Sequence, residues 1–89
     1  MQNLEDAPIC QSCSMPMKDR EDFGTNLDGT KNEEYCAYCF SAGNFVDPSI
    51  SKDEMVQQVT ELMMQSEKGS IQEIRLAVDR RIRNLRRWQ

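Results

Sequence analysis

The four cysteines of this sequence are the residues whose type and spacing can do chemistry. They form two Cys-x2-Cys pairs, Cys10 with Cys13 and Cys36 with Cys39, separated by residues 14–35. Two residues between paired cysteines allow a tight turn to aim both sulfurs at one point, and the long intervening segment brings the second pair to the other side of a tetrahedron. The spacing therefore predicts that all four thiolates bind one Zn²⁺ in a closed, structural site, with no coordination position left open for a reacting water.

Two other uses of the cysteines remain open from the sequence. A Cys-x2-Cys pair can act as a dithiol switch, and zinc thiolates can be oxidised with release of the metal. A thioredoxin-like role would require the motif within a βαβ unit, and nothing in this sequence predicts parallel strands. Four cysteines can also bind iron. We therefore expect a structural zinc site, with a redox switch and an iron site as alternatives.

The composition favours a small protein that is not an enzyme. The chain has 89 residues, 38% of them hydrophobic, and no histidine, so neither a Ser-His-Asp triad nor a Cys-His pair can form. A chain of this length has room for only a small core, and metal binding would supply the missing stability. We expect a flexible N-terminus at 1–9, a zinc-binding module at 10–46 that unfolds without metal, and a helical hairpin at 47–89 packed on that module in a single folding unit.

The pattern around the cysteines predicts loops and short strands. Residues 10–45 lack a sustained apolar period of 3.6 or 2, and turn-forming residues are dense there. Asp28-Gly29 supplies the positive φ of a two-residue turn, so strands over 23–27 and 30–35 are expected to pair across it. Residues 36–43 could follow as a short helix. The predicted fold class is small metal-stabilised α+β, either a zinc ribbon or a treble-clef-like module with one β-hairpin, followed by two helices.

Two capping boxes predict the C-terminal helices. Ser51 with Glu54 opens the first helix and Ser70 with Glu73 opens the second, while Gly69 ends the first. The apolar stripes expected to form the core are Met55, Val56, Val59, Leu62 and Met63 on one helix and Ile71, Ile74, Val78, Ile82 and Leu85 on the other, with Trp88 at its edge.

The cysteines stand among residues that resemble a known family. The segments Cys10-Gln11-Ser12-Cys13-Ser14-Met15-Pro16-Met17 and Phe23–Phe40, with Gly43-Asn44-Phe45 and Leu85-Arg86-Arg87-Trp88, resemble the zinc-ribbon family of small bacterial proteins. The resemblance implies zinc binding by the four cysteines, and some relatives are fused to or labelled as transcription regulators. It implies no established biochemical activity. Ser14 departs from the family pattern, in which glycine is commoner at this position.

The basic C-terminus suggests a further kind of partner. Residues 75–89 carry six arginines against one acidic residue, whereas the chain as a whole has a net charge of -4. Arg80, Arg83 and Arg87 would share the helix face opposite the apolar stripe, where they could neutralise nucleic-acid phosphates. The acidic remainder of the chain and the lack of an aromatic stacking platform favour a solvated face instead, or docking of this tail on the cysteine module.

These observations predict a non-enzymatic zinc protein that serves as a protein-interaction or transcription-regulatory module. Nucleic-acid binding through the arginines and a thiol redox switch are the alternatives. No apolar stretch approaches the length of a bilayer span and the N-terminus is polar and acidic, so we expect no membrane partner and a cytoplasmic location. The aromatic side chains near the second cysteine pair are expected to shield the metal from solvent, namely Tyr35, Tyr38, Phe40 and Phe45.

Overall fold

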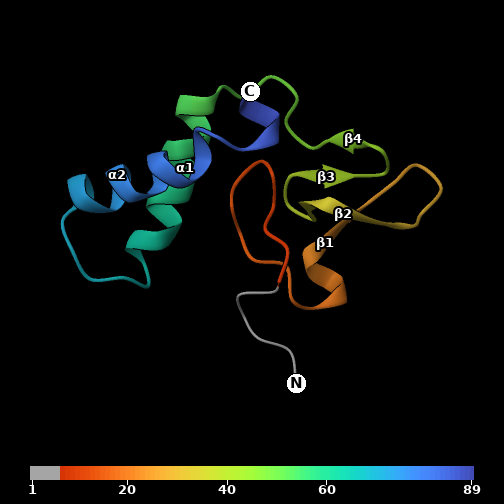
Figure 1. The fold of residues 1–89 in the computed structure, drawn as a ribbon, viewed down its shortest axis with the longest axis horizontal. Coiled ribbons are helices and arrows are strands. Elements are labelled where there is room, and N and C mark those ends of the chain that lie inside the picture. The colour runs from red at the N-terminus through yellow and green to blue at the C-terminus, as the bar shows by residue number, and fades with distance from the viewer. Residues whose placement is uncertain (1–6) are drawn as a thin grey trace.

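The computed structural model describes residues 7–89 and has an α+β fold. Loops and two small antiparallel strand pairs form one part, and two helices lie beside them (Figure 1). The elements in chain order are a 3-10 turn η2 (Arg20–Asp22), strands β1 (Phe23–Thr25), β2 (Lys31–Cys36), β3 (Phe40–Ser41) and β4 (Asn44–Phe45), helices α1 (Lys52–Met64) and α2 (Ile71–Ile82), and a 3-10 turn η3 (Arg86–Trp88).

The predicted hairpin is confirmed, with shorter strands. β1 and β2 pair antiparallel, and a bulge between Phe23 and Gly24 shifts their register. The turn already begins at Asn26, whose backbone N–H donates to the Thr30 carbonyl at 2.8 Å. Asp28 accepts hydrogen bonds from the backbone and hydroxyl of Thr30, at 3.0 and 2.6 Å. This side-chain turn extends the connection and leaves less chain for the strands.

A second hairpin, which the sequence did not reveal, occupies the place of the expected short helix. β3 pairs with β4 through Phe40 opposite Phe45. The two residues between the strands, Ala42 and Gly43, have φ of 51° and 83°. Positive φ at both central residues is the geometry of a type I′ turn, for which alanine is an unusual residue. The expected helix at 36–43 is therefore wrong, and the fold is a zinc ribbon rather than a treble clef.

Both predicted helices are present and begin at the predicted caps. The Ser51 hydroxyl accepts from the Glu54 backbone at 3.1 Å, and the Glu54 carboxylate accepts from the Ser51 backbone at 2.9 Å. Ser70 caps α2 through the Glu73 backbone N–H at 3.2 Å. α1 ends at Met64, several residues before Gly69. The two helices cross at a steep angle instead of lying side by side along their length (Figure 1).

The core is one continuous cluster that joins the helices to the cysteines. Its buried members are Cys10, Met17, Cys36, Cys39, Ile50, Met55, Val56, Ile74, Val78, Ile82 and Leu85. The prediction that Leu62 and Ile71 belong to the core is wrong, because Leu62 is 65% and Ile71 53% exposed. Leu62 lies at the edge of its stripe, and Ile71 is the first residue of α2, at the end of the helix.

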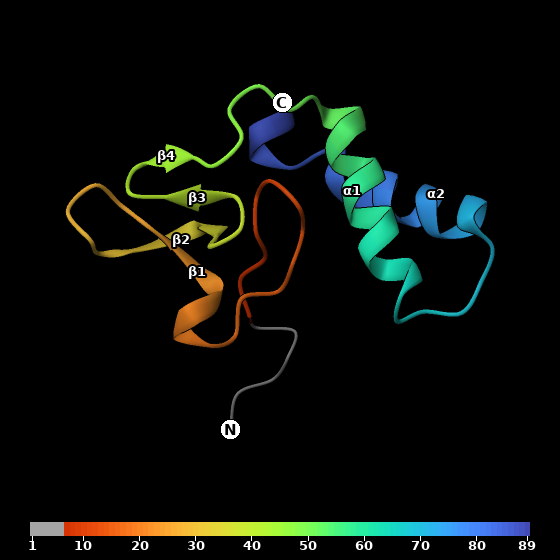
Figure 2. The same ribbon diagram turned by 180° about the vertical axis from the view of Figure 1, so that it is seen from behind.

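The ends of the described chain are tied to the cysteine module. Of the N-terminus predicted to be flexible, residues 1–6 lie outside the described part, and the Pro8 carbonyl accepts from the Met17 backbone at 2.8 Å. α2 ends at Ile82, and the chain then turns back so that η3 lies between the strands and α1 (Figure 1, Figure 2). No helix among residues 7–89 is both long and apolar enough to span a membrane.

Candidate metal centre

The first cysteine pair lies in a tight loop closed by its own backbone. The Ser14 N–H donates to the Cys10 carbonyl at 2.9 Å, and the Cys10 N–H donates to the Met15 carbonyl at 2.8 Å. Ser14 has a φ of 70°, in the left-handed region where glycine is preferred. The departure from the family pattern therefore falls on a residue whose backbone conformation favours glycine. The loop directs Cys10 and Cys13 inward.

The second pair begins at the end of a strand. Cys36 is the last residue of β2 and Cys39 directly precedes β3, with the Cys39 N–H donating to the Cys36 carbonyl at 3.1 Å. The two pairs are connected by the Gln11 N–H, which donates to the Glu34 carbonyl of β2 at 2.7 Å. The β1–β2 hairpin thus holds the second pair against the first.

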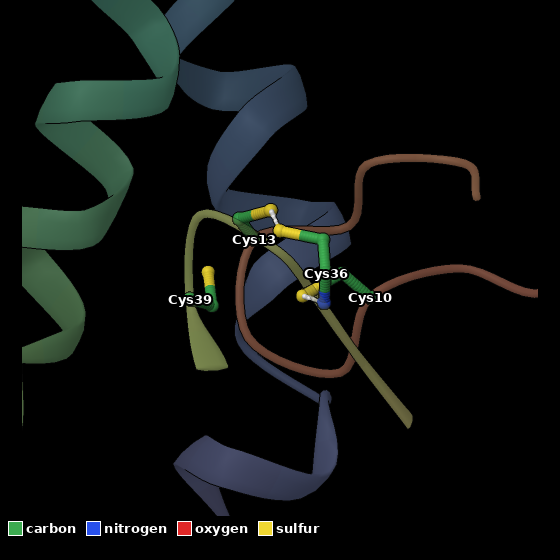
Figure 3. Close-up of side chains that lie close together, drawn as sticks. All are labelled: Cys10, Cys13, Cys36 and Cys39. Atoms are coloured by element: carbon green, nitrogen blue, oxygen red, sulfur yellow. Dashed lines mark hydrogen bonds between the residues drawn. The ribbon is translucent and has the colours of Figure 1, made fainter. Parts of the chain in front are cut away.

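The four sulfurs form one compact group. They all lie within 4.8 Å of one another, and the Sγ atoms of Cys13 and Cys36 are 3.7 Å apart. A tetrahedral zinc with Zn–S bonds of about 2.3 Å places its sulfurs about 3.8 Å apart. The side chains converge from the two loops (Figure 3), and the Cys36 N–H donates to the Cys10 sulfur at 3.2 Å. The four cysteines therefore fit a single zinc ion.

The thiols depend strongly on one another for their protonation. Hydrogen bonds from Cys13 and then from Cys36 and Cys39 lower the pKa of Cys10, because neighbouring S–H groups stabilise its thiolate. The hydrogen bond with Cys10 is in turn the largest cause that raises the pKa of Cys13. A set of four adjacent thiolates therefore requires a bound cation to balance its charge, and zinc supplies two positive charges at that point.

A comparison with protein families decides the identity of this module. Residues 9–89 match the family described as "Putative zinc ribbon domain". The chain belongs to this zinc-ribbon family. The match covers the helices as well as the cysteines, so the family resemblance expected from the sequence is confirmed. No curated protein and no solved structure matches the chain.

The C-terminal tail docks on the cysteine module, as one interpretation of its arginines predicted, through contacts that we call the C-terminal clasp (residues 85–88). Ser12, between the first two cysteines, is fully buried. The Arg87 guanidinium donates to its hydroxyl at 3.0 Å, and the Trp88 indole donates to its carbonyl at 2.7 Å. The backbone N–H of Arg87 also donates to the Gln11 carbonyl at 3.1 Å. The basic charge of residues 75–89 indicated that the tail could dock, but it did not indicate Gln11 and Ser12 as the partners.

The clasp changes the interpretation of the arginines. α2 ends at Ile82, so the expected single helix face carrying Arg80, Arg83 and Arg87 is wrong. Arg83 forms an ion pair with Asp79 at 2.6 Å. The Arg87 guanidinium lies 4.0 Å from the centre of the Phe45 ring and donates to the Asp47 carbonyl at 2.7 Å. Arg80 is exposed. Nucleic-acid binding by the three arginines stays a prediction, although their side chains do not share one helix face.

Three of the four aromatic residues expected near the metal pack on one another. The rings of Tyr35, Phe40 and Phe45 lie with their centres 4.9 to 5.4 Å apart. Tyr38 is 81% exposed, so its expected role as a shield is wrong. It lies in the turn between Cys36 and Cys39, where its neighbours must point inward as ligands and its own side chain is directed to solvent.

Proposed function

We propose that this zinc ribbon is a non-enzymatic protein-interaction or transcription-regulatory module whose zinc has a structural role. The observation that carries the proposal is the donor set. Four convergent cysteines occupy all four positions of a tetrahedral zinc, which leaves no site for an activated water or a substrate. The metal then holds a loop-rich surface in one conformation, and that surface is what a partner recognises.

Metal analysis and partner capture test this proposal together. The full chain should contain one zinc ion, and a Cys36→Ser variant should lose both the metal and the ordered β-strands. The zinc-loaded chain should retain a protein partner from its own cell, and the Cys36→Ser variant should not. A catalytic turnover that persists after alanine replacement of all four cysteines would contradict the proposal, because the zinc would then have no bearing on the function.

A redox switch is a second candidate, and the observation that favours it is the partial exposure of one of the four ligands. Cys10 and Cys36 are fully buried, whereas Cys13 is partly exposed. Oxidation by peroxide would therefore reach Cys13 first, since thiolate oxidation follows exposure. Zinc content should fall under mild peroxide and recover with a thiol reductant and added zinc. A zinc content that stays constant through this treatment would end this candidate.

A further inference from the structure

An apolar groove lies between the first cysteine pair and helix α1. Its volume is about 740 Å³, and most of its wall is apolar, including Met15, Tyr38, Ile50, Met55, Val59 and Met63. Clefts that bind ligands typically enclose about 300–1,000 Å³. Cys13 and Cys39 also line the groove, so it borders the metal centre. Its two walls are thus the zinc-organised loops and one face of a helix.

Large apolar side chains at the groove are exposed to solvent. Leu62 on the α1 wall is 65% exposed, and Tyr38 on the opposite wall is 81% exposed. Leu62 was predicted to lie in the core, but it lines the groove and does not pack on α2. Apolar groups gathered at a concave surface are typical of an interaction site.

The shape of the groove favours a helix as its occupant. The α1 wall extends from Met55 to Met63, a rise of about 12 Å or a little over two helical turns, and Ser66 extends the lining beyond the end of the helix. None of the described residues that line it belongs to a strand, so an extended peptide would find no strand edge to pair with. An amphipathic helix binds such a groove through side chains alone. The methionines of the wall can adapt their shape to varied apolar partners.

One exposed cation at the groove, Arg81, favours a carboxylate on the occupant at that point. Arg81 is exposed, its Nη1 lies 4.0 Å from the Met63 sulfur, and it makes no ion pair with any residue of 7–89. Arg87 also lines the groove, but the clasp holds its guanidinium against Ser12 beside the thiolates. Arg81 is therefore the cation available to a ligand, and Asp47 is the acidic side chain among the described lining residues. A carboxylate near Arg81 would be attracted, and a basic group there would be repelled.

We propose that this groove binds an amphipathic helix of a partner protein through about two to three of its turns, with a carboxylate at the edge of its apolar face that pairs with Arg81. The proposal rests on the interaction role given above and specifies its surface and class of partner. It requires no change in the metal centre.

A peptide-display selection on the zinc-loaded full chain tests the proposal. The probe is a library of helical peptides of about 16 residues, long enough to extend about one turn beyond each end of the α1 wall, with randomised edge positions. Selection should enrich peptides with apolar residues at i, i+3, i+4 and i+7 and Asp or Glu beside them. Leu62→Glu should weaken their binding by about tenfold or more, the effect of losing one central contact. Arg81→Glu should weaken it similarly and restore binding to peptides whose carboxylate is exchanged for lysine.

Matched variants separate the groove from the general surface. Arg80→Glu makes the same charge change one residue away, and Leu76→Glu places a charge on another exposed leucine outside the groove. Both should bind the selected peptides as the native chain does, and all four variants should retain one zinc and native circular dichroism. A variant that loses its zinc is replaced by Leu62→Gln or Arg81→Gln, with the same expected direction.

Three outcomes would overturn the proposal. The first is a selection that enriches no helical peptide, or one that enriches basic peptides. The second is binding that is unchanged in Leu62→Glu and Arg81→Glu, which would exclude the groove and leave the interaction role standing. The third is a dimer in sedimentation equilibrium that becomes a monomer in Leu62→Glu, because a second copy of the chain would then cover the groove. Capture of a cellular partner by the full chain tests the interaction role independently of these results.

Discussion

The cysteine module and the two helices become ordered by different means. Between residues 9 and 46 the strands are two to six residues long, and the buried apolar residues there are three of the four cysteines and Met17. The helices begin at serine caps and bury apolar stripes against each other. Burial of a few side chains cannot offset the conformational entropy of some forty loop-rich residues, at about 1–2 kcal/mol each, so the module depends on zinc coordination.

The two regions nevertheless meet in one core. The cysteines and the helix stripes belong to a single buried cluster, and the C-terminal clasp connects the end of α2 to the loop between Cys10 and Cys13. The difference in how each region is stabilised therefore need not produce two independent folding units. Variants in each region should show how far the effect of one reaches the other.

Removal of zinc should have the largest effect. Chelation should remove an apparent free energy on the order of 10 kcal/mol and unfold the module. The helices should lose most of their circular dichroism as well, because helices of 13 and 12 residues are marginal alone and would lose their packing against the module. Chelator titration followed by amide exchange measures both regions. Helices that remain fully protected without zinc would show that the two regions fold separately, and zinc readdition is the control for reversibility.

Truncation of the helical core should have the next largest effect. Ile82 is fully buried at the end of α2, next to the clasp. Ile82→Ala should reduce the free energy of unfolding by about 2–5 kcal/mol, through lost burial and the cavity that remains. Denaturant unfolding of the zinc-loaded chain measures it. Leu76→Ala, at a residue that is 60% exposed, should cost far less. Equal losses in the two variants would argue that α2 is not packed as described.

Loss of the clasp should affect both regions, because the clasp connects them. Arg87→Ala removes a charged donor from the buried Ser12 hydroxyl and should cost about 1.5–3 kcal/mol. It should also speed zinc transfer to a chelator, because the loop that carries Cys10 and Cys13 loses its support. The control is Arg80→Ala, which changes the same charge at an exposed position. If the two variants release zinc at the same rate, the clasp has no influence on the metal centre.

The parts that could be predicted from the sequence are those specified by local pattern. The Cys-x2-Cys spacing predicted the metal ligands, and the serine caps predicted where α1 and α2 begin, because each signal acts within four residues of chain. Asp28-Gly29 likewise indicated β1 and β2. These features need no knowledge of which segments meet in space.

The parts that could not be predicted depend on tertiary contacts. The hairpin of β3 and β4 turns at Ala42, and a positive φ would not be predicted for an alanine. The second half of the arginine-rich segment was expected to continue α2, but α2 ends at Ile82, and the residues of η3 contact Gln11 and Ser12 instead. Leu62 fitted the apolar period, and only the steep crossing of the helices leaves it facing a groove.

Replacement of Ser14 by glycine should stabilise the module slightly. Ser14 has a φ of 70°, and a non-glycine residue in this region costs about 1–2 kcal/mol, of which glycine recovers a part after its greater backbone entropy. Ser14→Gly should therefore raise the free energy of unfolding by up to about 1 kcal/mol. The matched change Ser41→Gly, in a strand, should lower it. A Ser14→Gly chain less stable than the native one would mean that the serine side chain contributes more than its strain removes.

The smallest effect should come from the cap of α1 and should depend on pH. The Ser51 backbone N–H donates to the Glu54 carboxylate and holds the pKa of Glu54 below its ordinary value. Because the folded pKa is the lower one, the stabilisation is complete above the unfolded value of about 4.3 and disappears as pH falls through the folded value. Glu54→Gln should therefore reduce stability at pH 7, and its difference from the native chain should shrink towards acid pH. Denaturant unfolding of both chains, from pH 7 down to the lowest pH at which both retain zinc, measures this difference. A difference that stays constant over that range would show that the charge of Glu54 does not act on the helix.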